Sequence, residues 1–125
     1  MTRVSKNIVR RPNVKRASVV AACNLMLRSE TLIFDVRDAE SYARQHIPSA
    51  RRVSDANMYE VLTTHPKDRP VLIYCYHGNA SQTVALTFID FGFREVYSMD
   101  GGFEGWRQAV AAAGNARSTG DAHGS

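Results

Sequence analysis

The sequence predicts an α/β fold in which a central parallel five-stranded sheet carries helices on both faces. Short apolar runs rich in β-branched residues alternate with segments of helical spacing, and this alternation is typical of parallel βαβ units. The chain has 125 residues, which suits one domain and allows a buried core without disulfides. We expect a single domain over residues 7–113, between a loose N-terminus (1–6) and a disordered tail (114–125).

Five segments are expected to form the strands. They are Asn7–Val9, Thr31–Val36, Arg51–Val53, Val71–Tyr74 and Val96–Met99. The fourth is apolar throughout, which is typical of a strand buried on both faces of a parallel sheet.

Five helices are expected between and after these strands, over residues 18–28, 39–45, 58–63, a segment from about 81 to 90, and 103–113. Ser18 and Asp38 are predicted N-caps, because their side chains can accept hydrogen bonds from free N–H groups of the first turn. Gly92 is expected to end the fourth helix.

Helical spacing also predicts which side chains are buried. Cys23 falls on the apolar face of the first helix, so we expect it in the core. In the last helix the expected buried face includes Phe103, Trp106 and Val110.

The charge pattern limits the possible partners. The formal net charge is +4, and seven basic residues precede the first acid, Glu30. We interpret this stretch as a solvated basic face and not as a nucleic-acid site, because no aromatic residue precedes Phe34 to stack on bases. No apolar run is long enough to span a membrane. The two cysteines form no disulfide framework or metal-ligand cluster, which favours the reducing cytoplasm.

The segment Val71–Ser81 carries the candidate site. Cys75 follows a buried strand and precedes a short loop that leads into a helix. Ligands bind at this edge of parallel sheets, and loop N–H groups and a helix N-terminus favour a thiolate there. The alternative is that Cys75 is a small buried apolar side chain; we favour the reactive thiol because of its position at the end of a strand.

Several reactions could use such a thiol. A phosphatase of this layout needs a guanidinium to hold phosphoryl oxygens, but the residue six positions after Cys75 is Ser81. A cysteine protease needs a histidine base, and the candidates are His46, His65, His77 and His123. Sulfur transfer needs only a thiolate and hydrogen bonds that stabilise a persulfide.

Three segments together resemble the rhodanese family. Residues 32–50 are similar to its first signature, Cys75–Ser81 to its active-site loop, and Asp100–Trp106 to its closing signature. The loop is most similar to that of the short single-domain bacterial thiosulfate sulfurtransferases linked with glycerol metabolism. Gln45 and Ser49 stand where the family's first signature commonly has glycines, and Ala80 where the most similar type usually has Ser.

The resemblance implies a rhodanese fold and a sulfurtransferase that carries persulfide sulfur on Cys75. The residues implied to bind substrate are Tyr76, His77, Gly78, Asn79, Ala80 and Ser81. Asp35 and Arg37 lie at the end of a strand and near the site by topology, and we expect them to support the site as a structural ion pair or loop anchor and not to act in catalysis. No metal or organic cofactor is implied. The implied donor is thiosulfate or a similar anion, and the acceptor is cyanide or a thiol, for example that of thioredoxin. The alternative is a weakly catalytic or non-catalytic module that carries sulfur or docks a partner.

Overall fold

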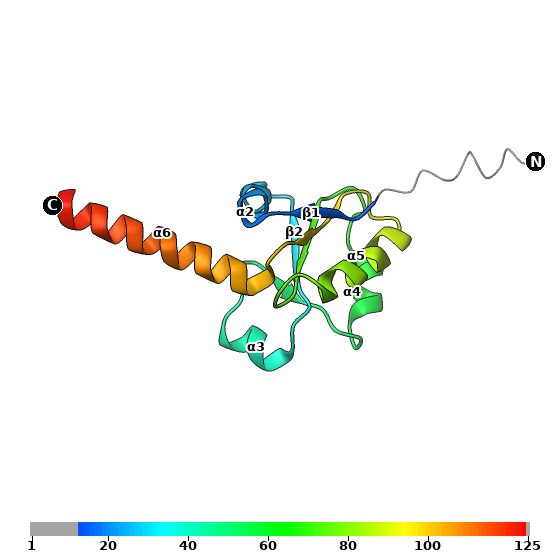
Figure 1. Cartoon of the computed structure of the whole chain (residues 1–125). Helices are drawn as coiled ribbons and strands as arrows, with labels where there is room; N and C mark the ends of the chain where they lie inside the picture. The colour runs from blue at the N-terminus through cyan, green and yellow to red at the C-terminus, as the bar shows by residue number, and fades with distance from the viewer. Residues whose placement is uncertain (1–12, 125) are drawn as a thin grey trace, which may run out of the picture.

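The computed structural model describes the backbone of residues 13–124 and the side chains of residues 13–114. One parallel sheet runs through the molecule in the strand order β1-β5-β4-β2-β3 (Figure 1). The strands are β1 (Lys15–Ala17), β2 (Leu32–Asp35), β3 (Arg51–Arg52), β4 (Val71–Tyr74) and β5 (Val96–Met99). The predicted α/β class and the five-stranded parallel sheet are therefore confirmed.

The first strand differs from the prediction. Asn7–Val9 lies outside the described residues, and the strand that pairs with β5 is Lys15–Ala17. This strand has two exposed residues and one buried one, Ala17. An edge strand that buries so little shows no apolar run, and the sequence pattern therefore gave no sign of it.

The helices cover both faces of the sheet. They are α2 (Val19–Leu27), α3 (Ala39–Arg44), α4 (Met58–Thr64), α5 (Ala80–Asp90) and α6 (Gly102–Gly124). Helix α2 and the start of α6 pack on one face, and α4 and α5 pack on the other.

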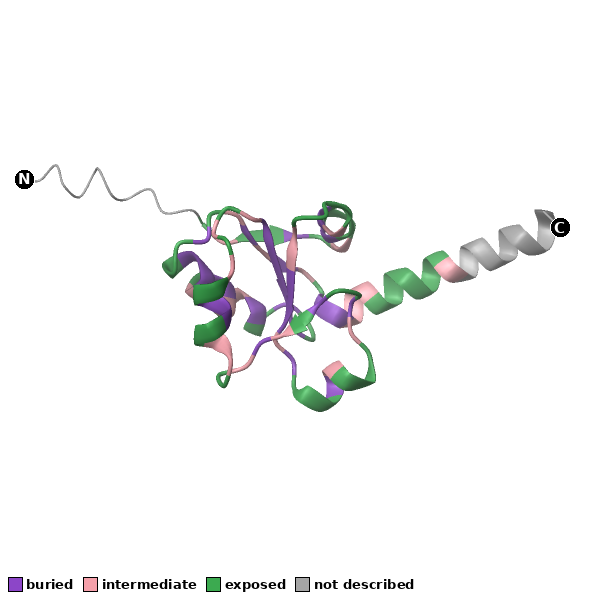
Figure 2. Cartoon of the chain, turned by 180° about the vertical axis from the view of Figure 1, so that it is seen from behind, coloured by how far each residue is buried: buried purple, intermediate pink, exposed green. Residues whose placement is uncertain are grey.

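The core is divided by the central strand β4, whose side chains alternate between the two faces. Leu72 and Tyr74 belong to the cluster beside α2 and α6, whereas Val71 and Ile73 belong to the cluster beside α4 and α5. All four are fully buried, and Figure 2 shows this buried centre enclosed by exposed helix surfaces.

The predicted helix ends are confirmed at three positions. The Ser18 hydroxyl accepts a hydrogen bond from the N–H of Ala21 at 3.1 Å, and the Asp38 carboxylate accepts one from Ser41 at 3.0 Å. Helix α5 ends at Asp90, and Gly92 then takes a φ of +100°, which a glycine adopts without strain.

The prediction that Cys23 is a core residue is wrong, because its side chain is exposed. Helix α2 turns only Ala22 and Leu25 fully inward. Cys23 lies one position after Ala22, about 100° further around the helix, and this rotation places it on the solvent side.

Helix α6 also differs from the prediction. It continues to Gly124 and does not end near Ala113, so the segment expected to be a disordered tail has helical backbone (Figure 1). Phe103 is buried and Trp106 partly buried against the core, but Val110 is 47% exposed and not buried as expected. Among the described side chains of α6, those that pack against the core lie at its beginning, and the high helix propensity of alanine favours helix in the alanine-rich run after Gln108.

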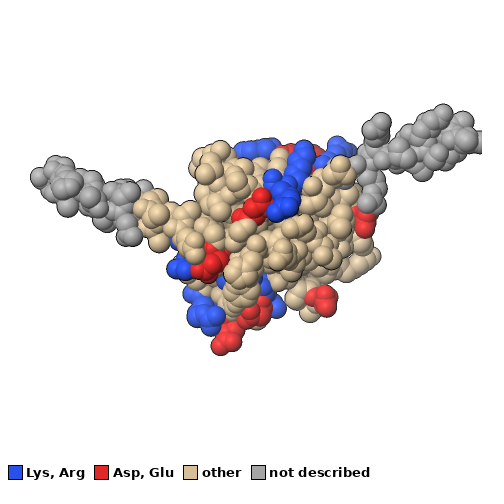
Figure 3. All heavy atoms as spheres, in the orientation of Figure 1, with Lys and Arg blue, Asp and Glu red and all other residues tan. Residues whose placement is uncertain are grey.

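Acidic side chains pair with part of the basic N-terminal stretch. Arg16 contacts Asp100 at 2.7 Å, and Arg28 contacts Glu30 and Glu95, each at 3.2 Å. Figure 3 shows red acidic groups among the blue basic ones along the top of the molecule, above β1 and α2. These pairs lower the net positive charge of that surface.

Candidate active site

Cys75 lies at the carboxyl edge of the sheet, directly after the central strand β4. Its side chain is 6% exposed and lines a pocket of about 330 Å³. The pocket is lined by Val36, Arg37, Asp38, Cys75, Tyr76, His77, Asn79 and Ala80. Strands β2 and β4 are neighbours in the sheet, so the residues that follow β2 and the loop that follows β4 lie side by side and line the same pocket.

The sulfur of Cys75 is surrounded by hydrogen-bond donors. The N–H of Gly78 donates to Sγ at 3.1 Å and the N–H of Ser81 at 3.4 Å, and the Ser81 hydroxyl lies 3.4 Å from Sγ. Burial alone would raise the pKa of Cys75, but the hydrogen bonds from Ser81, Gly78 and the backbone of His77 together lower it below the ordinary thiol value. The loop therefore stabilises an anionic sulfur.

Gly78 is required by the shape of this loop. Its φ is +103°, and a Cβ there would lie 3.1 Å from the carbonyl oxygen of Met99 and 3.2 Å from the nitrogen of Gly101. Any side chain would be strained and would press on the turn that follows β5. The N–H of Gly78 reaches the sulfur only because the loop can take this tight path.

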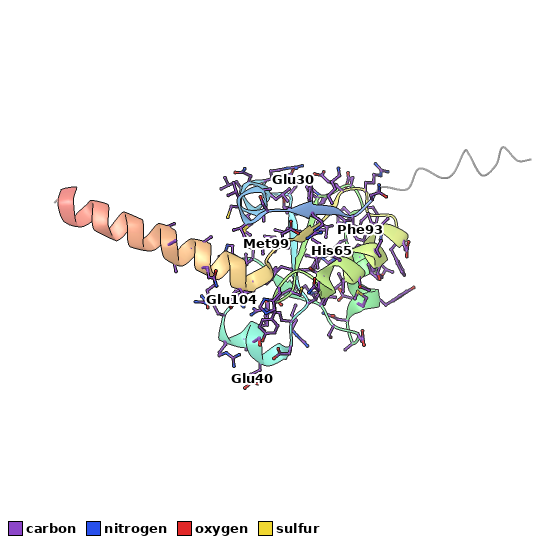
Figure 4. The ribbon with its side chains drawn as sticks, in the orientation of Figure 1. Glu30, Glu40, His65, Phe93, Met99 and Glu104 are labelled. Atoms are coloured by element: carbon purple, nitrogen blue, oxygen red, sulfur yellow. The ribbon has the colours of Figure 1, made fainter. Side chains whose placement is uncertain are left out.

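The beginning of α6 holds the other side of the loop. The N–H of Phe103 donates to the carbonyl of Cys75 at 2.7 Å, and that of Glu104 donates to the carbonyl of Tyr76 at 3.2 Å. In Figure 4, Met99 lies at the end of β5 and Glu104 in the first turn of α6, so the turn between them lies against the loop. These bonds fix the carbonyl groups and leave the N–H groups on the sulfur side.

Asp35 and Arg37 form a buried ion pair, as expected. Arg37 Nη2 lies 2.8 Å from Asp35 Oδ2 and donates to the carbonyl of Gln45 at 2.6 Å. Both side chains are almost fully buried, and the guanidinium carbon lies 3.9 Å from the ring centre of Phe103. The pair therefore ties the end of β2 to the loop after α3 and to α6.

Tyr76 forms one wall of the pocket. Its hydroxyl donates to Asp38 Oδ1 at 3.1 Å and shares a hydrogen bond with the Ser41 hydroxyl. Hydrogen bonds from the side chain and backbone of Ser41 lower the pKa of Asp38 to about 2. Asp38 is therefore an anion at neutral pH and holds the Tyr76 side chain against α3.

The remaining loop residues lie at the pocket but do not bind the sulfur with their side chains. His77, Asn79 and Ala80 all line the pocket and are exposed. Asparagine tolerates unusual backbone conformations better than most residues, but Asn79 has ordinary right-handed helical torsion angles. Its backbone therefore gives no reason for an asparagine at this position. His46 lies outside this pocket; its Nδ1 is 2.8 Å from the Tyr42 carbonyl oxygen, and this hydrogen bond holds the loop that follows α3.

Sequence reasoning missed four residues at the site. Val36 and Asp38 line the pocket, Ser41 contacts Tyr76, and Ser98 contacts Ser81. Asp38 and Ser41 lie on the cap of α3, which the sequence identified only as a helix start. Ser98 is a polar residue inside an otherwise apolar strand, and this was the one available signal for it.

The described residues contain neither a metal-binding cluster nor a membrane-spanning helix. No three His, Cys, Asp or Glu side chains gather there as a metal-ion site would require. No helix in that part of the chain is long and apolar enough to cross a membrane.

The fold and the site define a class of protein: an α/β domain that holds a nucleophilic thiol in a cradle of N–H and O–H donors at the carboxyl edge of a parallel sheet. A family model described as a rhodanese-like domain matches residues 19–109. The chain belongs to the rhodanese family.

Named relatives and solved structures agree with this assignment. The thiosulfate sulfurtransferase GlpE of Coxiella burnetii is 44% identical over 93 residues, which covers 74% of this chain and 87% of that protein. The protein of the same name from Pseudoalteromonas translucida is 39% identical over 97 residues, with 78% and 92% covered.

Two solved structures show the shared fold. A rhodanese-like domain protein from Staphylococcus aureus has a TM-score of 0.65 and 26% identity, over 74% of this chain and 91% of that one. A Rhodopseudomonas palustris protein described as a possible tyrosine phosphatase has a TM-score of 0.68 and 25% identity, over 78% and 82%.

Proposed function

We propose that this protein is a sulfurtransferase that moves sulfane sulfur from thiosulfate, or a similar small anionic donor, through a persulfide on Cys75. The acceptor is cyanide or a thiol, for example the thiol of thioredoxin. The single observation that carries the proposal is the set of hydrogen-bonding groups around the sulfur: the N–H groups of Gly78 and Ser81 donate to it, and the Ser81 hydroxyl lies 3.4 Å away. Relatives named thiosulfate sulfurtransferase support the reaction class.

The first step uses the thiolate of Cys75 as the nucleophile. It attacks the outer sulfur of thiosulfate, a new S–S bond forms, and the S–S bond of thiosulfate breaks. Sulfite leaves with the electron pair of the broken bond. The persulfide on Cys75 is itself anionic, and the N–H groups of Gly78 and Ser81 are placed to stabilise the developing and final charge.

The second step returns the enzyme to its starting state. Cyanide attacks the outer persulfide sulfur, a C–S bond forms, and thiocyanate leaves while the electron pair of the S–S bond returns to Cys75 as thiolate. A thiolate acceptor reacts in the same way and becomes a persulfide. The step needs no oxidant, reductant or metal ion.

The pocket suits small reactants that reach the sulfur from one side. Its volume of about 330 Å³ holds a small anion or the tip of a thiol-bearing partner loop. The proposed site of action is the cytoplasm, where a reducing environment keeps both Cys75 and the exposed Cys23 as thiols. We propose no nucleic-acid or membrane partner; the pairing of Arg16 and Arg28 with acids supports this for the described basic face.

The test is intact mass after mixing with thiosulfate, followed by thiocyanate formation with cyanide. The protein should gain the mass of one sulfur atom on Cys75 and lose it when cyanide is added. Cys75→Ser should abolish both results, and Cys23→Ser should change neither, because Cys23 lies on the solvent side of α2. A Cys75→Ser protein that still forms thiocyanate would contradict the proposal. A persulfide that forms but does not turn over would indicate a sulfur carrier instead of an enzyme.

A further inference from the structure

A row of two buried hydroxyl groups leads away from the sulfur of Cys75. Ser81 Oγ lies 3.4 Å from Sγ and 2.7 Å from Ser98 Oγ. Ser81 is fully buried and Ser98 is 1% exposed, so water does not compete for these groups. Ser98 lies on β5, next to β4, and its hydroxyl makes no other hydrogen bond with the part of the chain that the structure describes.

The number of protons in this row depends on the state of Cys75. The row has two links, from sulfur to Ser81 and from Ser81 to Ser98. When Cys75 is a thiol, the row contains three donors, namely the S–H group and the two hydroxyls, but its members can form two hydrogen bonds among themselves. One buried donor is therefore left without an acceptor in the row. When Cys75 is a thiolate, Ser98 donates to Ser81 and Ser81 donates to the sulfur, so that each donor has an acceptor. A buried donor without a partner is unfavourable, so the row favours the anionic sulfur.

We propose that Ser98 is a positioning residue for Cys75: its hydroxyl donates to Ser81 Oγ and thereby directs the Ser81 hydroxyl proton toward the sulfur. Ser98 does not touch the reacting atom and acts only through Ser81. A hydroxyl that accepts a hydrogen bond is also a stronger donor, so the bond from Ser81 to an anionic sulfur is strengthened. The same arrangement would hold a persulfide anion. This inference deepens the proposed function, since it rests on Cys75 acting as a thiolate nucleophile.

In the part of the chain that the structure describes, no charged side chain directs the Ser81 hydroxyl proton toward the sulfur in place of Ser98. The titratable groups that face the pocket are Arg37 and Asp38 after β2, and Tyr76 and His77 in the loop. Arg37 is bonded to Asp35, and Asp38 is an anion that would oppose a second negative charge. From α6, Glu104 lies near His77 but bonds Arg107. The hydrogen bonds to Sγ come from backbone N–H groups and from the Ser81 hydroxyl.

The test is a titration of Cys75 without any sulfur donor, in a Cys23→Ser background where Cys75 is the one remaining thiol. Thiolate absorbance and the rate of iodoacetamide alkylation are followed against pH. Ser98→Ala should raise the apparent pKa of Cys75 by about 0.5–1 unit, which is a roughly three- to tenfold lower thiolate fraction below the pKa. Tyr97→Phe is the matched control: it removes a hydroxyl from the same strand that bonds Glu95, so the titration should not move.

Two further comparisons separate positioning from a general effect on folding. Ser98→Thr keeps the hydroxyl, so Cys75 should titrate as in the parent protein. Ser98→Val gives a side chain of the same shape as Ser98→Thr but without the hydroxyl, and it should behave like Ser98→Ala. If Ser98→Ala does not fold, the comparison of these two variants decides the question. In a Ser81→Ala background, Ser98→Ala should add no further shift, because its path to the sulfur is absent. A folded Ser98→Ala protein with the parental titration, or equal shifts with and without Ser81, would overturn the inference. The titration uses no sulfur donor, so neither result bears on persulfide formation, which the mass measurement with thiosulfate tests separately.

Discussion

Neutral hydrogen-bond donors, and not a nearby cation, give Cys75 its chemical character. Burial opposes ionisation, and the bonds from the Ser81 hydroxyl and from the N–H groups of Ser81, Gly78 and His77 outweigh it. Their combined effect lowers the pKa of Cys75 from its ordinary thiol value. In the folded state the thiolate is therefore present at a lower pH than in the unfolded chain.

This shift predicts the pH dependence of Cys75 reactivity. In the Cys23→Ser protein, the rate of alkylation by iodoacetamide should reach half of its maximum below the pH at which a model thiol does, because the thiolate is the reacting form. In 8 M urea the midpoint should move up to that of the model thiol, because the hydrogen bonds of the loop are lost. Because folding lowers the pKa of Cys75, the thiolate adds to the free energy of unfolding. This contribution is fully present above the pKa of the unfolded chain, and it is lost as the pH falls through the pKa of the folded protein. Equal midpoints in the folded and unfolded protein would contradict this.

Ser49 is a second residue whose backbone conformation matters. Its φ is +72°, and it is the one residue other than glycine with positive φ in the described part of the chain. The surrounding turn is held by the Ala50 N–H, which donates to the Ile47 carbonyl at 3.0 Å, and by the Tyr42 hydroxyl, which donates to the Ala50 carbonyl at 2.5 Å. The fold therefore imposes a left-handed conformation on a residue that disfavours it.

Ser49→Gly should stabilise the protein. Relief of the left-handed strain contributes about 1–2 kcal/mol, and the greater freedom of glycine in the unfolded chain offsets about 0.5–1 kcal/mol of it. We expect a net gain of roughly 0.5–1 kcal/mol in the free energy of unfolding from urea denaturation. The matched control is Gln45→Gly, at the other position where a glycine is missing. Gln45 has a φ of −167°, which is extended backbone, so this change should only destabilise. Opposite signs for the two variants are the expected outcome.

The residues that the sequence suggested for the site, and that lie at this edge of the sheet in the structure, are those whose place depends on local chain position. Cys75 could be identified because a strand end and a loop adjoin it in the sequence, and Asp35 and Arg37 because they share the end of a strand. Ser98 could not be identified, because its contact with Ser81 depends on the pairing of β5 with β4. Side-chain alternation in a short strand does not show which polar residue meets the site.

At the level of elements, the turn between β5 and α6 is as important for the site as the loop that contains Cys75. Gly102 has a φ of +58°, and a Cβ there would lie 2.4 Å from the carbonyl oxygen of Tyr76 and 2.6 Å from that of Cys75. These atoms belong to the backbone and cannot move without moving the cradle. The close approach of the two segments is what allows Phe103 and Glu104 to bond the loop carbonyls.

Gly102→Ala should therefore impair both stability and the site. The clash and the left-handed conformation together should lower the free energy of unfolding by roughly 2–4 kcal/mol. Because the loop must shift, persulfide formation from thiosulfate should slow even in the fraction that remains folded. The control is Gly114→Ala in the same helix, where a Cβ would meet nothing within 4 Å; it should be neutral or slightly stabilising. A Gly102→Ala protein with parental stability and parental persulfide formation would show that the contact is not needed.

The errors at this level have a common physical cause. Cys23 and Val110 lie on helix faces that look apolar in the sequence, but α2 buries only Ala22 and Leu25, and Phe103 is the buried apolar side chain among those described in α6. Sequence periodicity shows that a helix has an apolar face but not how much of that face has a neighbour. The edge strand β1 shows the opposite case. It has no apolar run that would predict a strand, but backbone pairing with β5 makes it one.

At the level of the whole molecule, the sheet order determines which reaction the pocket can support. Among the described residues, the one guanidinium that lines the pocket belongs to Arg37, and its Nε and Nη2 groups donate to the Asp35 carboxylate and the Gln45 carbonyl. Its charge is balanced by Asp35 in the same buried pair. The loop itself has Ser81 six positions after Cys75. A phosphoryl group would therefore find N–H donors but no free bidentate cation.

We accordingly predict that the protein does not act as a phosphatase, although it shares its fold with a protein described as a possible tyrosine phosphatase. Hydrolysis of p-nitrophenyl phosphate should be no faster with the parent protein than with Cys75→Ser, in a preparation that forms thiocyanate from thiosulfate and cyanide. Inorganic phosphate should also fail to protect Cys75 from iodoacetamide, whereas thiosulfate should remove the free thiol by converting it to the persulfide. Phosphate release that depends on Cys75 would mean that the neutral donors around the sulfur suffice to hold a phosphoryl group. In that case the distinction between sulfur and phosphoryl transfer in this fold could not rest on the guanidinium.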